Sequence, residues 1–253
     1  MACSGITVFD AINGDNTHTS TVFRAEVIPH NLAVDIPQWA LIKAASPDVP
    51  HSLENLEREL QSYLLPGVAS AACYRKLYET IRDPTDGSEK YVTMEWFDTT
   101  LAAVKYQPNM RIYALIKTFL RAALESRVVL EKQNHVNTDF KPANILLAGL
   151  GCAEITAKVG DLGLVFPAGQ RYNAQPYAMR APEVFVGQPC TEPSQVWAVA
   201  AMLLCWIKAG VMGQWDSPHW LIDDAWCMAK IKRLFPDWKI PTPDEFERKS
   251  SKF

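Results

Sequence analysis

The fold of this chain is decided by the stretch Asn137-Thr138-Asp139-Phe140-Lys141-Pro142-Ala143-Asn144-Ile145-Leu146-Leu147. It is followed along the chain by Gly160-Asp161-Leu162-Gly163 and then by Ala181-Pro182-Glu183. A loop of ordinary turn residues would explain the first stretch taken alone. The ordered set of all three segments argues against that reading, because an aspartate, a lysine and an asparagine precede a short apolar strand and a second aspartate follows it.

These segments resemble the catalytic loop H-R-D-x-K-x-x-N, the D-F-G segment and the A-P-E segment of eukaryotic protein kinases, in the same order and at similar spacing. The resemblance covers nearly the whole chain. It implies an α+β, two-lobed fold in one kinase domain. Residues 1–97 would form a small lobe of sheet and one helix, and residues 98–253 a larger, mostly helical lobe that is shortened at its C-terminus.

The resemblance also assigns roles, because phosphoryl transfer needs positioning and charge neutralisation more than covalent chemistry. Asp139 would accept the proton of the substrate hydroxyl, and Lys141 would steady the γ-phosphate of ATP. Asn144 and Asp161 would hold Mg²⁺, while Gly163 would leave the backbone free to turn. A lysine two residues after Asp139 is more typical of serine/threonine kinases than of tyrosine kinases.

Upstream, Ala40-Leu41-Ile42-Lys43 resembles the kinase strand V-A-I-K. The resemblance places Lys43 on the α- and β-phosphates, paired with a carboxylate of the following helix. We favour Glu59 for this partner, with Glu57 as the alternative. A solvated helix face would explain either glutamate taken singly.

The segment Tyr91-Val92-Thr93-Met94-Glu95-Trp96-Phe97 resembles the strand and hinge that contact adenine in kinases. Met94 would be the gatekeeper, and the Glu95 carbonyl and the Phe97 amide would meet the base. The same resemblance places Val22, Ala40 and Leu146 at the nucleotide. Any buried strand would show similar apolar residues.

The phosphate-covering loop departs from the kinase pattern. Aligning on Val22 puts Asp15, Thr17 and Ser20 at the three glycine positions, with Gly14 just outside. Side chains there hinder the approach of backbone amides to phosphates. This departure favours the alternative of a pseudokinase, which binds nucleotide or protein without transferring phosphate.

Two further departures concern the catalytic loop, where Asn137-Thr138 replaces His-Arg and Gln195 replaces the aspartate that begins the central helix. We therefore expect an amide–amide contact between Asn137 and Gln195. We also expect no need for phosphorylation of the loop that carries Tyr172 and Tyr177.

The C-terminal segment departs from the pattern as well. The arginine that pairs with the A-P-E glutamate in kinases has no counterpart here, so Glu183 either lacks a partner or borrows Arg233 or Arg248. Arg180 before Ala181-Pro182-Glu183 resembles the R-A-P-E of the kinase group that contains the cyclin-dependent, dual-specificity and SR-protein kinases, and the wording T-D-x-K-P-x-N-I-L resembles the SR-protein kinases.

Apolar periodicity predicts the individual elements. Strands are expected at Ile6–Ile12, Ser20–Ile28, Trp39–Ala44, Ala72–Ile81, Lys90–Trp96, Asn144–Leu147 and Lys158–Val159. Helices are expected after a Ser52 cap with Leu53, Leu56, Leu60 and Leu64 on one face, at Arg111–Leu130 with Ile112, Ile116, Phe119, Ala123 and Leu124 on one face, at Val196–Ala209, and near Asp223–Leu234.

Composition fits an ordinary globular protein, with 48% hydrophobic and 21% charged residues and a net charge of −3. The charge gives no basic footprint for nucleic acid, and no apolar run is long enough to cross a membrane. We expect a cytoplasmic protein that uses ATP, Mg²⁺ and a protein substrate, with nuclear targeting by the cluster Lys230, Lys232 and Arg233 as an alternative. A small-molecule phosphotransferase and a helical interaction protein explain the segments less well.

Overall fold

The first third of the chain forms an antiparallel sheet in the computed structural model, which describes residues 6–12, 20–27, 38–46, 48–82, 89–171 and 175–239. Its strands are β1 (Ile6–Ile12), β2 (Ser20–Val27), β3 (Trp39–Ala45), β4 (Leu77–Arg82) and β5 (Glu89–Glu95), in the order β1-β2-β3-β5-β4. The first three strands confirm the sequence prediction to within one residue. The central strand β3 buries Ala40, Leu41, Ile42 and Ala44 because it has neighbours on both edges.

Helix α1 (Ser52–Leu64) lies against this sheet, and the short α2 (Pro66–Ser70) follows it. The predicted Ser52 cap is wrong, since His51 precedes the helix in the left-handed region (φ 61°) with no side-chain cap. The Ser52 hydroxyl instead accepts a hydrogen bond from the Ser46 amide at 2.6 Å. The helix buries Leu56, Glu59, Leu60 and Tyr63, whereas Leu53 and Leu64 are exposed and fall outside the predicted face.

The predicted strand Ala72–Ile81 is too long at its start. Residues 72–76 leave the sheet and lie beside β9 (Thr156–Val159) of the second half of the chain. Tyr74 forms a parallel bridge with Val159, and the Arg75 amide donates to the Val159 carbonyl at 3.0 Å. A long-range pairing of this kind overrides the local strand preference. Residues 83–88, which join this strand to β5, lie outside the described residues.

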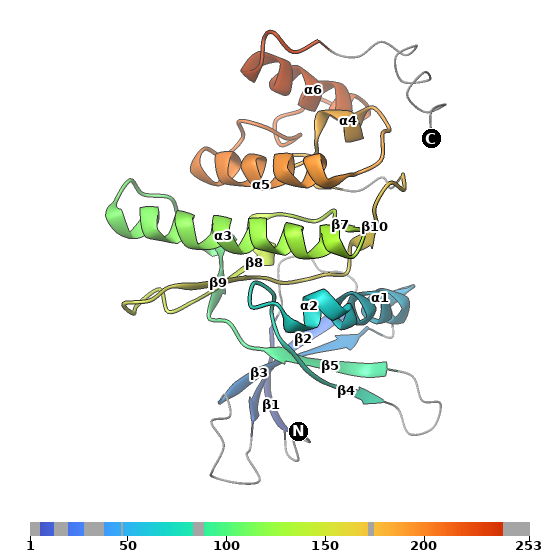
Figure 1. Ribbon diagram of the computed structural model, residues 1–253, viewed down its shortest axis with the longest axis vertical. Coiled ribbons are helices and arrows are strands. Elements are labelled where there is room, and N and C mark those ends of the chain that lie inside the picture. The colour runs from blue at the N-terminus through green and yellow to red at the C-terminus, as the bar shows by residue number, and fades with distance from the viewer. Residues whose placement is uncertain are drawn as a thin grey trace.

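The rest of the chain is mainly helical. Its helices are α3 (Met110–Lys132), α4 (Pro182–Phe185), α5 (Glu192–Ile207) and α6 (Asp223–Leu234), with short 3₁₀ turns η1 (Leu101–Ala103), η2 (Pro142–Asn144) and η3 (Trp220–Ile222). Small strands lie between them: β6 (Thr99–Thr100) pairs with β8 (Ile145–Ala148), which pairs with β9, and β7 (His135–Asn137) pairs with β10 (Val165–Pro167). In Figure 1 the N-terminal sheet lies at the bottom, with α1, α3, α5 and α6 above it in succession.

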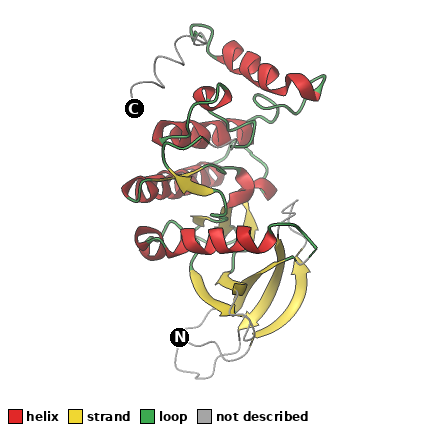
Figure 2. Cartoon of the chain, turned by 90° about the vertical axis from the view of Figure 1, so that its right-hand side faces the viewer, coloured by secondary structure: helices red, strands yellow, loops and turns green. Residues whose placement is uncertain are grey.

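Figure 2 shows the same layers from the side, with the large sheet at one end and the helices at the other. This arrangement confirms the predicted α+β class, with a sheet-rich N-terminal region and a helical C-terminal part.

One apolar core joins the two regions, because residues of the sheet, of α1, of α3 and of α5 belong to the same buried cluster. Helix α3 contributes Leu115, Phe119, Ala122, Ala123 and Leu130. The predicted face of α3 is wrong at Leu124, which is 41% exposed. Burial of apolar surface contributes about 25 cal/mol per Å² and holds the strands β7 and β9 against α3. Within the described residues, none of the helices has the length and apolar content needed to span a membrane.

Candidate active site

The loop at 138–144 is held in place by the strand pair β7–β10. Val165 of β10 pairs with Asn137 of β7. Next to this pair, the Leu164 carbonyl accepts hydrogen bonds from both the amide (3.0 Å) and the hydroxyl (2.8 Å) of Thr138. Thr138 stands where kinases carry an arginine, and here it ties the loop before Asp139 directly to the segment that follows Asp161.

Asp139 lies at the centre of a small polar cluster. Its Oδ2 accepts from Lys141 Nζ at 2.8 Å and from Asn144 Nδ2 at 2.9 Å, and Asn144 Nδ2 also donates to the Asp139 carbonyl at 2.9 Å. Burial raises the pKa of Asp139, although Lys141 and Asn144 oppose that shift. The carboxylate is thus more basic than a free aspartate, as a proton acceptor requires.

A second cluster forms around Lys43 on β3. Its Nζ donates to the carboxylate of Glu59 on α1 and lies 3.6 Å from Asp161 Oδ1. Of the two glutamates considered from the sequence, Glu59 is the one that contacts Lys43; Glu57 is exposed. Burial opposes the charge on Lys43, but Glu59 and Asp161 outweigh it and raise the pKa of Lys43 to about 12. Burial raises the pKa of Glu59, while the neighbouring Lys43 pulls it the other way.

Asp161 connects the two clusters. Burial alone would raise the pKa of Asp161, but the charges of Lys43 and Lys141 hold it below its ordinary value. The negative charge of Asp161 in turn acts on Asp139. Asp161 itself takes the left-handed backbone conformation (φ 53°), whereas Gly163 is not among the glycines of positive φ. The freedom to turn that we assigned to Gly163 stays a prediction.

Arg58 is a residue of this region that the sequence did not reveal. Its Nε donates to the Gly163 carbonyl at 2.6 Å, its Nη2 donates to Asn55 Oδ1 at 2.7 Å, and its guanidinium lies 5.5 Å from the centre of the Phe166 ring. Arg58 precedes Glu59 on α1, so one helix contacts both Lys43 and the loop after Asp161. Only the position directly before Glu59 could have pointed to it.

The expected contact between Asn137 and Gln195 exists in a different form. Gln195 Oε1 accepts from the backbone amide of Asn137 at 2.8 Å, and Asn137 Oδ1 accepts from the Asp139 amide at 2.8 Å. The side-chain nitrogens of Asn137 and Gln195 are buried without a partner among the described residues. The two side chains therefore hold the backbone before Asp139. The predicted contact between Asn137 and Gln195 is confirmed, but it joins the Gln195 side chain to the Asn137 backbone amide and not the two side-chain amides.

Glu183 has a partner that we did not expect. Its Oε1 accepts from the Ser194 hydroxyl at 2.6 Å, and Ser194 also completes the capping box of α5 with Thr191. A hydroxyl in the first turn of α5 thus takes the place expected for Arg233. Arg248 lies outside the described residues.

The residues predicted to contact adenine come from several strands. Ala40 lies on β3 opposite Glu95 of β5, and Val22 lies on β2 opposite Lys43. Met94 is buried in the core. Leu146 lies on β8, and its side chain leaves no room for a Cβ on Gly160, which would come within 2.6 Å of Leu146 Cδ1. Their role at a nucleotide stays a prediction, as do the phosphate-loop positions Asp15 and Thr17, which lie outside the described residues.

The hinge segment shows two further contacts. The Glu95 carboxylate binds Lys158 Nζ at 2.7 and 2.9 Å and accepts from the Lys76 amide at 3.0 Å. The Phe97 ring is buried, 5.8 Å from the cationic groups of both Arg75 and Lys158. The Glu95 side chain thus joins the sheet to β9, which leaves only its backbone for the predicted adenine contact.

The side chains present fit a magnesium ion. Mg²⁺ is usually held by one or two oxygen ligands of the protein together with substrate phosphates and water. Asn144 uses its amide nitrogen on Asp139, which directs that nitrogen away from a cation and leaves Oδ1 as the ligand atom. Asp161 supplies a carboxylate whose lowered pKa keeps it charged.

Comparison with known proteins finds similarity to protein kinases. The chain is 35% identical over 81 residues to a stress-activated protein kinase JNK of Drosophila melanogaster, which covers 30% of this chain and 21% of the relative. It is 26% identical over 145 residues to the protein of the same name from Suberites domuncula, which covers 54% of this chain and 38% of the relative. No model of a known protein family matches the chain.

The matched part thus spans less than two fifths of either relative. These similarities support a kinase-like chain in general, and they give no support to the SR-protein kinase likeness inferred from the wording T-D-x-K-P-x-N-I-L.

Proposed function

We propose that this chain is a protein kinase that transfers the γ-phosphate of ATP to the hydroxyl of a serine or threonine in a protein. One observation carries the proposal. The pair Lys43–Glu59 and the cluster around Asp139 approach each other through Asp161, whose charge acts on both. A structural ion pair would explain Lys43 with Glu59 alone, and a loop cap would explain Asp139 alone. Neither explains why Lys43, Asp139 and Lys141 all lie around Asp161.

The proposed roles follow from the chemistry of these groups. Lys43, held by Glu59, would bind the α- and β-phosphates. Asp139 would take the proton of the acceptor hydroxyl while the oxygen of that hydroxyl forms a bond to the γ-phosphorus. The bond between that phosphorus and the β–γ bridging oxygen breaks, and ADP leaves. Lys141 would bind the γ-phosphate during its transfer, since the Lys141 ammonium lies 2.8 Å from the Asp139 carboxylate.

A bound Mg²⁺, held by Asn144 and Asp161, would supply positive charge to the phosphates. The two regions on either side of these residues would act as lobes that divide near residues 97 and 98. The choice of serine and threonine as acceptors rests on Lys141, and the choice of a protein as the substrate rests on the similarity to the stress-activated protein kinases named above. We expect the protein to act in the cytoplasm.

Asp15, Thr17 and Ser20 at the glycine positions of the phosphate loop favour a second candidate function, that of a pseudokinase. An aspartate near a polyanion weakens nucleotide binding by repulsion. The same fold would then serve as a nucleotide-binding or protein-binding scaffold.

A transfer assay separates the two candidates. The full chain is incubated with γ-labelled ATP, Mg²⁺ and a pool of serine and threonine peptides, beside the variants Lys43→Met and Asp161→Asn. Transfer that each variant reduces by about 10²-fold or more supports the kinase. Absence of transfer together with a higher melting temperature in ATP supports the pseudokinase. Equal transfer by all three proteins would reject the proposed site.

A further inference from the structure

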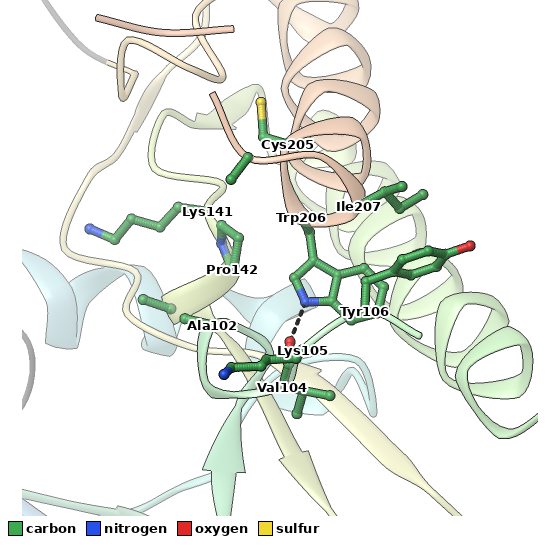
Figure 3. Close-up of a pocket in the computed structure, with 11 residues that line it drawn as sticks. Ala102, Val104, Lys105, Tyr106, Lys141, Pro142, Cys205, Trp206 and Ile207 are labelled. Atoms are coloured by element: carbon green, nitrogen blue, oxygen red, sulfur yellow. Dashed lines mark hydrogen bonds between the residues drawn. The ribbon is translucent and has the colours of Figure 1, made fainter. Parts of the chain in front are cut away.

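A cavity of about 530 Å³ opens beside Lys141, on the helical side of the candidate active site (Figure 3). Three segments line it. They are η1 and the residues after it, the start of η2, and the C-terminal end of α5, and they contribute Val104, Lys105, Tyr106, Lys141 and Trp206 among others. None of these residues except Lys141 has a role in the transfer proposed above.

One wall of the cavity is fixed in place by Trp206. Its Nε1 donates to the Val104 carbonyl at 2.7 Å, the bond drawn as a dashed line in Figure 3. The same indole meets Tyr106 and Phe119 edge to face, with ring centres 5.7 Å apart in both pairs. These contacts tie α5 to the segment after η1 and to α3, so the cavity is bounded by packed elements.

The charge on the lining is of one sign. Lys105 and Lys141 are its charged residues, and no carboxylate is among them. Lys105 is exposed and forms no ion pair with a described residue, whereas Lys141 is paired with Asp139. The remaining lining is largely apolar. A glutamate or aspartate side chain matches a lining that combines apolar surface with lysine. Its methylene groups can cover the apolar surface while its carboxylate contacts a lysine ammonium group.

The position of the cavity relates it to an acceptor peptide. Lys141 lines the cavity and also places its Nζ 2.8 Å from Asp139 Oδ2, so one side chain separates the cavity from the predicted base. An extended chain advances about 3.3–3.6 Å per residue. A residue only a few positions from the phosphorylated hydroxyl would therefore reach the cavity.

We propose that this cavity selects substrates with a glutamate or aspartate within about three residues of the phosphorylated serine or threonine, and that Lys105 is the residue that reads the acid. This inference rests on the proposed kinase function, because it assumes that a serine or threonine near the cavity is phosphorylated. The cavity and its charge do not depend on that function.

The test uses short peptides with one central serine and neutral flanks. A single glutamate, leucine or lysine is moved through the positions on either side of the serine. Relative kcat/KM is measured for each peptide with the full chain. At one position we expect glutamate to exceed both leucine and lysine by about fivefold, the size that one partly exposed ion pair supports.

Lys105→Glu is the decisive variant. For each protein, kcat/KM for the glutamate peptide is divided by kcat/KM for the lysine peptide. This ratio should exceed one in the wild type and fall below one in Lys105→Glu. Lys117→Glu, an exposed lysine of α3 that does not line the cavity, makes the same charge change and should keep the wild-type ratio. Equal preference for leucine and glutamate, or an unchanged ratio in Lys105→Glu, would overturn the proposal.

A binding measurement keeps the result independent of catalysis. The same peptides, labelled with a fluorophore and carrying alanine at the acceptor position, are titrated against wild type and Lys105→Glu by anisotropy. Suppose that the wild type binds the glutamate peptide more tightly, that Lys105→Glu reverses this preference, and that neither protein phosphorylates a serine peptide. This result supports the selection of acidic residues by the cavity and rejects the kinase function. Transfer without any glutamate preference in either measurement rejects the cavity proposal alone.

Discussion

Gly160 directly precedes Asp161, and a side chain at Gly160 would collide with Leu146 of β8. A Cβ at this position would approach Leu146 Cδ1 to 2.6 Å, far below ordinary contact. The absence of a side chain therefore sets the position of Leu146, which we expect to face the adenine of ATP. Overpacking of a well-filled site costs about 1–3 kcal/mol.

We predict that Gly160→Ala shifts Leu146 and weakens ATP binding by about tenfold, since about 1.4 kcal/mol corresponds to that factor. The measurement is an ATP titration followed by melting temperature. Gly151→Ala is the matched control, because a Cβ at Gly151 meets no atom within 4 Å. Equal ATP affinity in the two variants would show that Leu146 does not contact the nucleotide.

The basicity of Asp139 gives a prediction about pH. Burial raises the pKa of Asp139, whereas the pKa of Asp161 is lowered by Lys43 and Lys141. As the pH falls, Asp139 is therefore protonated first. The rate of transfer should fall on the acid side at a pH above the ordinary aspartate value of about 3.9.

The fold should outlast this loss of rate. A carboxylate with a lowered pKa contributes stability that is present above its unfolded pKa and is lost only as the pH falls through its folded pKa. Asp161 therefore still stabilises the folded state where Asp139 has become protonated. Measurement of kcat/KM against pH beside circular dichroism checks both statements. A rate that stays constant until the protein unfolds would mean that Asp139 is not the base.

At the scale of elements, α1 determines whether the parts of the site meet. It carries Glu59, which binds Lys43, and Arg58, which binds the Gly163 carbonyl after Asp161. A hydrogen bond to a charged group contributes about 1.5–3 kcal/mol. Together with the Thr138–Leu164 bonds, this contact holds the segment after Asp161 in place.

We predict that Arg58→Met lowers kcat about tenfold or more and changes KM for ATP little, because the loss of about 1.5–3 kcal/mol falls on the alignment of Asp161. Steady-state kinetics measure this split. Arg121→Met, an exposed arginine of α3, is the control and should leave both constants unchanged. A rise in KM with unchanged kcat would place Arg58 in nucleotide binding.

At the scale of the whole molecule, the sequence predicted what local chemistry determines. The strands β1 to β3 and the helix α6 could be predicted because apolar periodicity is a local property of the sequence. The pairing of Lys43 with Glu59 could be predicted because both residues occupy positions that resemble those of the kinase pattern. The helix α1 was predicted with the wrong cap, since the left-handed conformation of His51 has no sequence signal of its own.

Features that depend on contacts between distant segments could not be predicted. The departure of residues 72–76 toward Val159, the bond of Arg58 to Gly163 and the choice of Ser194 for Glu183 each join residues that only the folded chain brings together. The cavity beside Lys141 belongs to the same class, because its wall requires α5 to reach the segment after η1.

The most direct test of the central claim compares wild type with Asp139→Asn in two measurements on the same preparations. Melting temperature with and without ATP and Mg²⁺ reports binding, and γ-phosphate transfer to a serine peptide reports chemistry. The account predicts an equal ATP-induced rise in melting temperature for both proteins and a loss of transfer of about 10²- to 10⁴-fold in Asp139→Asn. Transfer by Asp139→Asn at the wild-type rate would contradict the account.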